Sequence, residues 1–225
     1  MPAVPKYTTS LGFLDNIKED LSYAVRRRVF VAFMRACEPS PLSRAADFGV
    51  TAERSHPTHA FFERLYPHPA RLTAIGREAS DWIPGEFPGV TFLRADLRGI
   101  PVPDLHFDVG ICNAVVEHAG DPASQRALVQ EVCRTCRKVL FTTPNRWFPV
   151  ELHTFLPLVH WLPKPAFRRV LKTLGYGALS LEENLNPLGA REFLALFPEG
   201  RENRLLDVSR LGLRTNLACL SSARA

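Results

Sequence analysis

Polar side chains lie at the ends of five successive strand-like segments. In an open α/β sheet, ligands bind at the edge formed by the carboxyl ends of the strands, so side chains at these positions can do chemistry. They are the carboxylates and amides Asp47, Glu78, Asp96, Asn113 and Asn145. A carboxylate accepts two hydroxyl hydrogen bonds at once, which suits a ribose diol, and it also accepts from an exocyclic amine. This order predicts an adenosine-containing cofactor across the strand ends, with Glu78 at the sugar and Asp96 at the base.

Histidines are the candidates for acid–base chemistry. His118 follows the fourth strand-like segment directly after Glu117, while His153 and His160 lie in an aromatic-rich stretch after the fifth segment. Because the pKa of histidine lies near neutrality, His is the natural general base when an acceptor must lose a proton. We predict His118 and His153 as catalytic residues. The alternative is that Glu117 and His118 only hold the loop before the next helix, and that the other two histidines are packing or surface residues.

The segments that must position these residues alternate between strand and helix patterns. Strand-like runs cover 44–50, 71–76, 90–96, 107–115 and 138–145, and helical patterns cover 13–37, 55–67 and 122–136. Parallel strands require crossover connections, which are usually helices. The alternation therefore predicts an α/β domain with a mostly parallel sheet and helices on both faces.

The chain is expected to form one domain over residues 1–225, with four parts. These are an N-terminal helical segment (1–41), a cofactor-binding core (42–145), a helical lid or insertion after the fifth strand (146–202) and closing strands (203–225). The third part is rich in aromatic residues and prolines. The last contains two strand-like runs, at least one of which should be antiparallel to the rest of the sheet.

The ordered set of segments resembles the class I S-adenosylmethionine-dependent methyltransferases, in particular their small-molecule type. The likeness covers roughly residues 42–145 and depends on Asp47 and Gly49 in "ADFGVTAE", on "FDVGICNAVVEH" and on "KVLFTTPNRWFP". It implies a Rossmann-like, seven-stranded sheet that ends in a reversed hairpin. It also implies methyl transfer from S-adenosyl-L-methionine to an oxygen or nitrogen of a small or lipid-like acceptor. The alternative functions are a catalytically silent binding or scaffold protein and, less favoured, an RNA or protein methyltransferase.

The resemblance further implies a set of cofactor-binding residues at four strand ends. These residues are Asp47, Gly49, Val50, Thr51, Glu78, Asp96, Leu97, Asn113 and Ala114. Thr51 stands where the family commonly has a second glycine. Because Val50 and Thr51 carry Cβ atoms and resist a positive φ, we expect the first loop either to take a different path from the family's or to stand further from the cofactor.

Composition limits the class of partner. The net charge is +5, and the basic residues are spread along the chain except at Arg26–Arg28, where they fan over a helix surface. The fourth-strand exit "NAVVEH" lacks the Asn-Pro-Pro-aromatic motif of base methylation. Nucleic-acid binding is therefore not expected.

The cysteines and the hydropathy of the chain indicate which cellular compartment to expect and whether metal binding or membrane contact should be considered. Five cysteines without a signal-peptide core predict reduced thiols and a cytoplasmic protein, and the lone pair Cys133 and Cys136 predicts packing rather than metal binding. We predict no metal site. The amphipathic stretch 155–175 is interpreted as a lid, with peripheral membrane contact as the alternative. The oligomeric state is not predicted.

Overall fold

A computed structural model describes residues 12–53, 57–78, 80–208 and 214–224. Its centre is a seven-stranded sheet in the order β3-β2-β1-β4-β5-β7-β6. The strands are β1 (Ala45–Phe48), β2 (Leu72–Gly76), β3 (Thr91–Arg94), β4 (Phe107–Asn113), β5 (Cys136–Pro144), β6 (Arg201–Leu206) and β7 (Asn216–Ala223). Strands β1 to β5 are parallel, and β7 pairs antiparallel with both β5 and β6.

The order of strands places a topological switch point between β1 and β4. From β1 the chain adds β2 and β3 on one side, and it then returns to add β4 and β5 on the other side. Asp47 of β1 is in register with Ile111 of β4. Ligands of open α/β sheets bind at the carboxyl ends of the strands at such a point, so this edge is where a site is expected.

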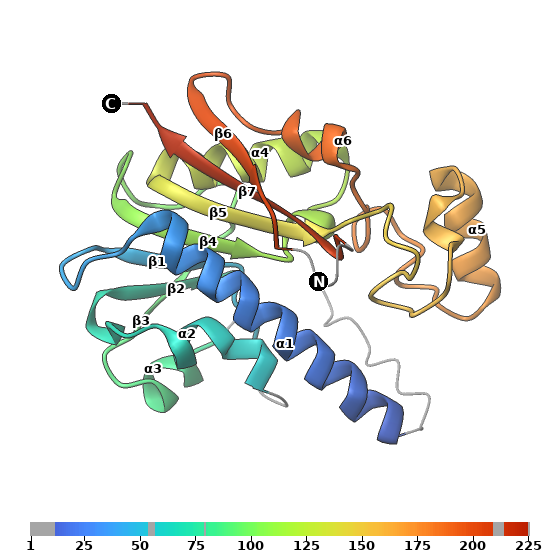
Figure 1. Ribbon diagram of the computed structural model, residues 1–225, viewed down its shortest axis with the longest axis horizontal. Helices are drawn as coiled ribbons and strands as arrows, with labels where there is room; N and C mark the ends of the chain where they lie inside the picture. Colours follow the sequence, from blue (N-terminus) through green and yellow to red (C-terminus); the bar gives the residue numbers. More distant parts are fainter. Residues whose placement is uncertain (1–11, 54–56, 79, 209–213, 225) are drawn as a thin grey trace.

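Helices cover both faces of the sheet (Figure 1). They are α1 (Gly12–Cys37), α2 (Phe61–Leu65), α3 (Trp82–Glu86), α4 (Pro122–Thr135), α5 (Lys164–Thr173) and α6 (Ala190–Leu194). Four short 3-10 helices connect them: η1 (Pro57–Ala60), η2 (Pro69–Arg71), η3 (Val116–His118) and η4 (Val159–Trp161). Helix α4 begins at Pro122, the first residue of the helical pattern in the sequence. It begins there because Asp121 accepts from the backbone N–H of Ser124 at 2.7 Å and because Pro122 fits the first turn of a helix.

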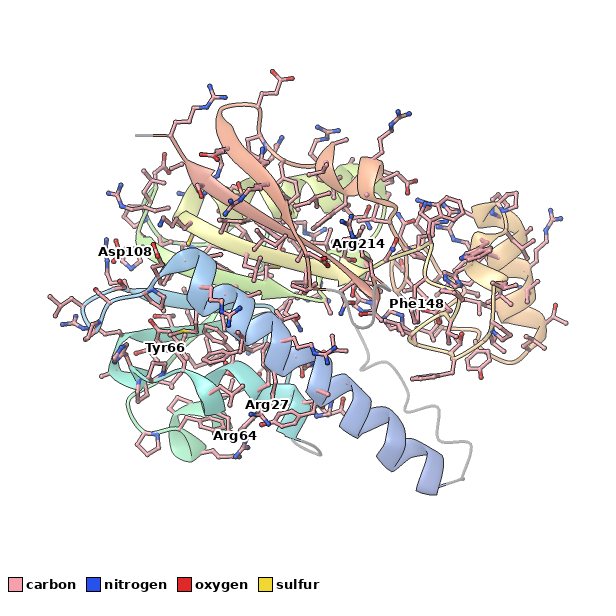
Figure 2. The ribbon with its side chains drawn as sticks, in the orientation of Figure 1. Arg27, Arg64, Tyr66, Asp108, Phe148 and Arg214 are labelled. Carbon is pink, nitrogen blue, oxygen red and sulfur yellow. The ribbon has the colours of Figure 1, made fainter. Side chains whose placement is uncertain are left out.

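Each face of the sheet has its own apolar cluster. Phe33 of α1 and Phe62 of α2 pack with Leu140 of β5 on one face, where Tyr66 lies below α1 (Figure 2). Phe141, the next residue of β5, packs with Val129 of α4 on the other face. Successive strand side chains point to opposite faces, and this alternation fixes both layers.

Residues 146–187 make up most of the stretch 146–202 that was predicted as a lid or insertion, and only these residues are called the lid from here on. They form a separate cluster beside the sheet (Figure 1). Phe167 and Leu171 of α5 are buried against Leu179 and Leu185. Phe148 lies at the junction of the lid with the sheet, where its N–H donates to the carbonyl of Asn145 at 2.9 Å (Figure 2). Part of the expected apolar face of the 155–175 stretch is thus covered by the protein itself, whereas Trp161 and Leu174 remain exposed.

The predicted fold is confirmed, with changes at the boundaries of elements. The helix expected over 55–67 is a 3-10 turn followed by five residues of α2, since prolines and short loops leave no room for more. Strand β6 begins at Arg201, inside the stretch assigned to the lid. All five cysteines are buried with free thiols. In the part of the chain that the structure describes, no helix is both long and apolar enough to cross a bilayer.

Candidate functional site

The loop after β1 depends on a single glycine. Gly49 has φ of +103°, and a Cβ there would lie 2.3 Å from Cγ2 of Val115. The N–H groups of Gly49 and Val50 both donate to the carbonyl of Ile75, at 2.8 and 3.1 Å. The loop therefore turns tightly against β2 and against the exit of β4, and only glycine fits this position.

Neither Val50 nor Thr51 has a positive φ. The Val50 side chain is buried among the core residues, and its carbonyl oxygen lies 2.3 Å from where a Cβ of Gly76 would be. Thr51 is exposed. At Val50 the backbone is the part that could reach a ligand, and the predicted cofactor contacts of both residues stay predictions.

Glu78 lies where the exits of β1 and β2 meet. Its side chain is exposed, and Oε2 accepts from the backbone N–H of Ala52 at 3.3 Å. A carboxylate has about four lone-pair sites, so this bond leaves capacity for the hydroxyls of a sugar. The geometry is compatible with the predicted ribose contact and does not test it.

Asp96 has a partner that the sequence analysis did not consider. Arg98 holds both carboxylate oxygens, with Nε at 3.0 Å from Oδ1 and Nη2 at 2.7 Å from Oδ2, and its backbone N–H donates to Oδ1 at 2.9 Å. The side-chain hydrogen bond from Arg98 is the main cause that lowers the pKa of Asp96 to about 2. Asp96 is thus an ionised acceptor at the β3 exit, beside the buried Leu97.

Asp47 occupies a different environment from the other acids of the set. Its side chain is buried, and it lies beside the carboxyl of Glu63 on α2. Burial, and then the neighbouring Glu63, raise the pKa of Asp47 well above its usual value, and burial raises the pKa of Glu63 to about 7. The side chain of Asp47 thus faces a packed helix instead of solvent, and a cofactor contact of Asp47 stays a prediction.

The exit of β4 holds a strained residue. Ala114 has φ of +54°, which is uncommon for a residue with a side chain, and its N–H donates to the carbonyl of Thr142 at 2.9 Å. Asn113 accepts from Oγ1 of Thr142 at 2.7 Å. Such strain is found preferentially at functional sites, where the surrounding structure imposes it. Here it directs the chain into η3 and places His118 at the sheet edge.

The two histidines that the sequence predicts as catalytic lie in contact. Nε2 of His118 and Nε2 of His153 are 3.2 Å apart, and the rings are nearly perpendicular. Nδ1 of His118 bonds the carbonyl of Asn184 at 2.6 Å, and Nδ1 of His153 bonds Oε1 of Glu151 at 2.7 Å. The structure therefore joins the β4 exit to the lid through this pair, while the catalytic role of the pair stays a prediction.

The histidines differ in their electrostatic surroundings. Burial lowers the pKa of His118. Burial also opposes the charged form of His153, but the hydrogen bond and charge of Glu151 outweigh it and raise the pKa of His153. Burial likewise acts on Glu151, and the bonds from His153 and Thr154 outweigh it and hold the pKa of Glu151 at about 2. A proton in this pair is thus favoured on His153.

Two buried carboxylates complete the group, and the sequence analysis assigned neither a chemical role. Glu117 is completely buried and accepts from Oγ1 of Thr143 at 2.9 Å. Glu151 accepts from His153 and from the backbone and hydroxyl of Thr154. The sequence feature that could have indicated such a role is the short spacing of each acid to a histidine, Glu117 to His118 and Glu151 to His153. His160, by contrast, is buried and bonds the carbonyl of Phe148 at 2.7 Å, as in the packing alternative.

The prediction of no metal site stays a prediction. Ligand atoms of Glu117, His118 and His153 lie within 4.8 Å of one another. The lid residue His153 is 35 positions from His118 along the chain, so only folding brings the three together.

Comparison with known proteins agrees with this architecture. The family model described as a methyltransferase domain matches residues 68–139, whereas no curated protein matches the sequence. Among solved structures, the N-methyltransferase NodS from Bradyrhizobium japonicum WM9 in complex with S-adenosyl-L-homocysteine has a TM-score of 0.55 and 15% identity, over 89% of this chain and 87% of that chain.

Two further structures have the same fold. The PH0226 protein from Pyrococcus horikoshii OT3 has a TM-score of 0.57 and 13% identity, over 98% of this chain and 96% of that chain. Human N-acetylserotonin methyltransferase in complex with SAM has a TM-score of 0.55 and 14% identity, over 95% of this chain and 55% of that chain. At these identities the likeness shows the fold alone. The chain therefore has the fold of the class I S-adenosylmethionine-dependent methyltransferases, and its residues 68–139 match the model of a methyltransferase domain.

Proposed function

We propose that the protein transfers the methyl group of S-adenosyl-L-methionine to an oxygen or nitrogen of a small, hydrophobic acceptor. The observation that carries the proposal is the contact of His118 with His153, which joins the β4 exit to the lid beside the predicted cofactor position. Methyl transfer is an in-line displacement in which the cofactor supplies the electrophile, so the protein mainly orients the partners and excludes water. An edge of the sheet that is covered by a lid suits both tasks.

The residues at the strand ends support an adenosine-containing cofactor. Gly49 and Gly76 lie at neighbouring strand ends, and at both a Cβ would lie 2.3 Å from atoms of Val115 and Val50, so the loops after β1, β2 and β4 can pack this closely only because no side chain is present. Glu78 would hold the ribose, and Asp96 the adenine amine. Ala114 and Asn113 would line the methionine side.

The lid supports a hydrophobic acceptor. It exposes large apolar side chains, with Trp147 at 57% and Trp161 at 40% of their full exposure, and the two indole rings lie 6.3 Å apart. Both residues belong to the segment that carries His153. Aromatic surfaces next to a few polar groups are typical of small-molecule sites. Because α5 buries Phe167 and Leu171 internally, the lid interpretation is favoured over an interfacial helix.

The direct test is isothermal titration with S-adenosylhomocysteine. The wild-type protein should bind it, and Glu78→Ala should weaken binding about tenfold or more, because two hydroxyl hydrogen bonds of about 1 kcal/mol each are lost. Glu86→Ala is the matched control, since Glu86 is an acid on α3 that pairs with Arg64. Absent binding would favour the silent scaffold alternative, which the single-glycine loop supports. Equal binding in both variants would remove the ribose contact assigned to Glu78.

Transfer itself can be followed with S-adenosylmethionine that carries a labelled methyl group. A panel of aromatic and aliphatic hydroxyl and amine compounds should include an acceptor that becomes labelled. His153→Ala should lower the rate of transfer by about 100-fold or more and leave the affinity for S-adenosylhomocysteine unchanged. Loss of both properties together would show that the histidine supports the fold of the cleft and not the transfer.

A further inference from the structure

The group formed by Glu117, His118 and His153 has the composition of a metal site. Two imidazole nitrogens and one carboxylate oxygen converge, with Nε2 of His118 at 3.2 Å from Nε2 of His153 and at 4.0 Å from Oε1 of Glu117. Metal bonds of about 2.0–2.1 Å in a tetrahedron place ligand atoms about 3.3 Å apart. The histidine pair already has this separation, and Oε1 of Glu117 lies about 0.7 Å farther from Nε2 of His118 than it would in such a tetrahedron.

The hydrogen bonds of the two rings turn both free nitrogens toward the same point. The carbonyl of Asn184 can only accept, so Nδ1 of His118 carries the hydrogen. The ionised carboxylate of Glu151 also only accepts, so Nδ1 of His153 carries the hydrogen there. In neutral rings with these tautomers both Nε2 atoms present lone pairs, and two lone pairs 3.2 Å apart repel unless a cation lies between or beside them.

Glu117 supplies an independent observation. Its side chain is completely buried, and among the described residues Oε1 has no hydrogen-bond donor, although Oε2 is bonded by Thr143. A buried carboxylate oxygen without a partner is costly, commonly by 1–3 kcal/mol. Nε2 of His118 lies 4.0 Å from Oε1. A cation bonded to Oε1 would remove this cost.

The surroundings are built as the outer shell of a metal site commonly is. Metal-binding histidines usually donate their other ring N–H to a carboxylate or a backbone carbonyl, which is the arrangement of Glu151 and Asn184 here. Glu151 is itself fixed by Thr154. A cavity of about 10 Å³, with room for about one water-sized particle, adjoins the group and is lined by Glu117, Glu151 and His153 but not by His118.

We propose that Glu117, His118 and His153 bind one divalent metal ion of the zinc type. Two imidazoles and a carboxylate with an open fourth position match catalytic zinc sites, whereas Mg²⁺ and Ca²⁺ prefer oxygen ligands throughout. The His118 side chain is 38% exposed, so the fourth position faces solvent at the strand edge. This step rests on the proposed methyl transfer. If that function holds, a hydroxyl-bearing methyl acceptor would bind the metal ion as its fourth ligand, and the histidines would contact the acceptor through the ion.

The proposal is tested with ZnCl₂ alone, by isothermal titration of full-length protein that a chelator has first stripped of metal. One Zn²⁺ per chain should bind with a dissociation constant tighter than about 1 µM. His118→Ala and His153→Ala should each weaken binding about 100-fold, and Glu151→Gln about tenfold. His68→Ala, a histidine outside the group, should bind as the wild type does.

The alternative occupant is a proton, with His153 donating through Nε2–H to His118. Nitrogen NMR of the imidazoles at neutral pH separates the two cases. In the metal-free protein a proton shared between the Nε2 atoms, together with no Zn²⁺ binding, would overturn the proposal, as would Zn²⁺ binding that all three variants leave unchanged. Circular dichroism checks that each variant is folded, and Glu117→Gln, which keeps the side-chain volume, provides a second measurement if an alanine variant unfolds.

This test does not depend on the cofactor. Zn²⁺ binding with no binding of S-adenosylhomocysteine would leave the metal site in place and remove the proposed function. The opposite result would remove only the metal site.

Discussion

Nε2 of His118 lies 3.2 Å from Nε2 of His153, although one residue follows β4 and the other belongs to the lid. The contact joins the exit of β4 to the lid, as does the bond from His118 to the carbonyl of Asn184 at 2.6 Å. It depends on how the lid folds, because the loop that carries His153 is fixed by Glu151 and Thr154. The stability of the lid is thus a condition for the site.

The lid should respond to substitution in its own core separately from the sheet. Leu171→Ala removes a completely buried side chain from the cluster of α5, and we expect a local destabilisation of about 2–4 kcal/mol. Limited proteolysis should cut between residues 146 and 187 faster than in the wild type, while the main thermal transition stays nearly unchanged. Leu174→Ala is the control, because Leu174 is 53% exposed. Equal loss of the whole fold would show that the lid and the sheet unfold as one unit.

Gly49→Ala should destabilise the protein by about 2–3 kcal/mol. The added Cβ meets Val115 at 2.3 Å, and φ of +103° is strained for any residue with a side chain. Urea denaturation gives the free energy of unfolding. Gly99→Ala, where nothing lies within 4 Å of the added carbon, should cost much less. The double variant Gly49→Ala, Val115→Ala should recover the steric part of the loss, and a double variant as unstable as the single one would contradict this account.

Glu63 should make stability fall as the pH rises. Burial raises its pKa from 4.5 to about 7 in the folded protein. The folded state therefore binds more protons than the unfolded state between these values, so this stabilisation is complete below about pH 4.5 and is lost as the pH rises through about 7. In Glu63→Gln this part of the pH dependence should disappear, a change on the order of 3 kcal/mol at most.

The measurement for Glu63 is urea denaturation between pH 5 and pH 8, compared across variants. Glu86→Gln serves as the control, since Glu86 is a partly exposed acid on α3. If wild type and Glu63→Gln keep the same difference in unfolding free energy at every pH, the buried pair of Asp47 and Glu63 does not titrate as the structure indicates.

Arg98→Ala should raise the pKa of Asp96 from about 2 toward its ordinary value of 3.8. The side-chain hydrogen bond from Arg98 is the largest cause of the low pKa, and it disappears with the guanidinium. Carboxyl NMR titration between pH 2 and pH 5 measures the shift directly. Arg94→Ala is the control, because Arg94 bonds the carbonyl of Arg77 instead. If the titration midpoint of Asp96 is the same in Arg98→Ala as in the wild type, the two side-chain hydrogen bonds from Arg98 to Asp96 are not formed in solution.

The sequence was sufficient for features that depend on local pattern. Alternating and helical spacings predicted the parallel strands and the helices around them, and the lone Gly49 predicted an unusual first loop. Histidines near strand ends were recognisable because a parallel sheet brings the carboxyl ends of its strands to one edge. Boundaries near prolines, as in η1 and α2, were less predictable because packing decides where a short helix ends.

Only the tertiary structure decided which side chains meet. It placed Asp47 against Glu63 inside the protein, and it brought His153 of the lid to Glu117 and His118. Such contacts join residues that are far apart along the chain, and their geometry depends on the summed packing of many elements. The sequence therefore determined the scaffold and the kinds of chemistry available at its edge, and the fold alone determined that two histidines and a buried carboxylate converge there.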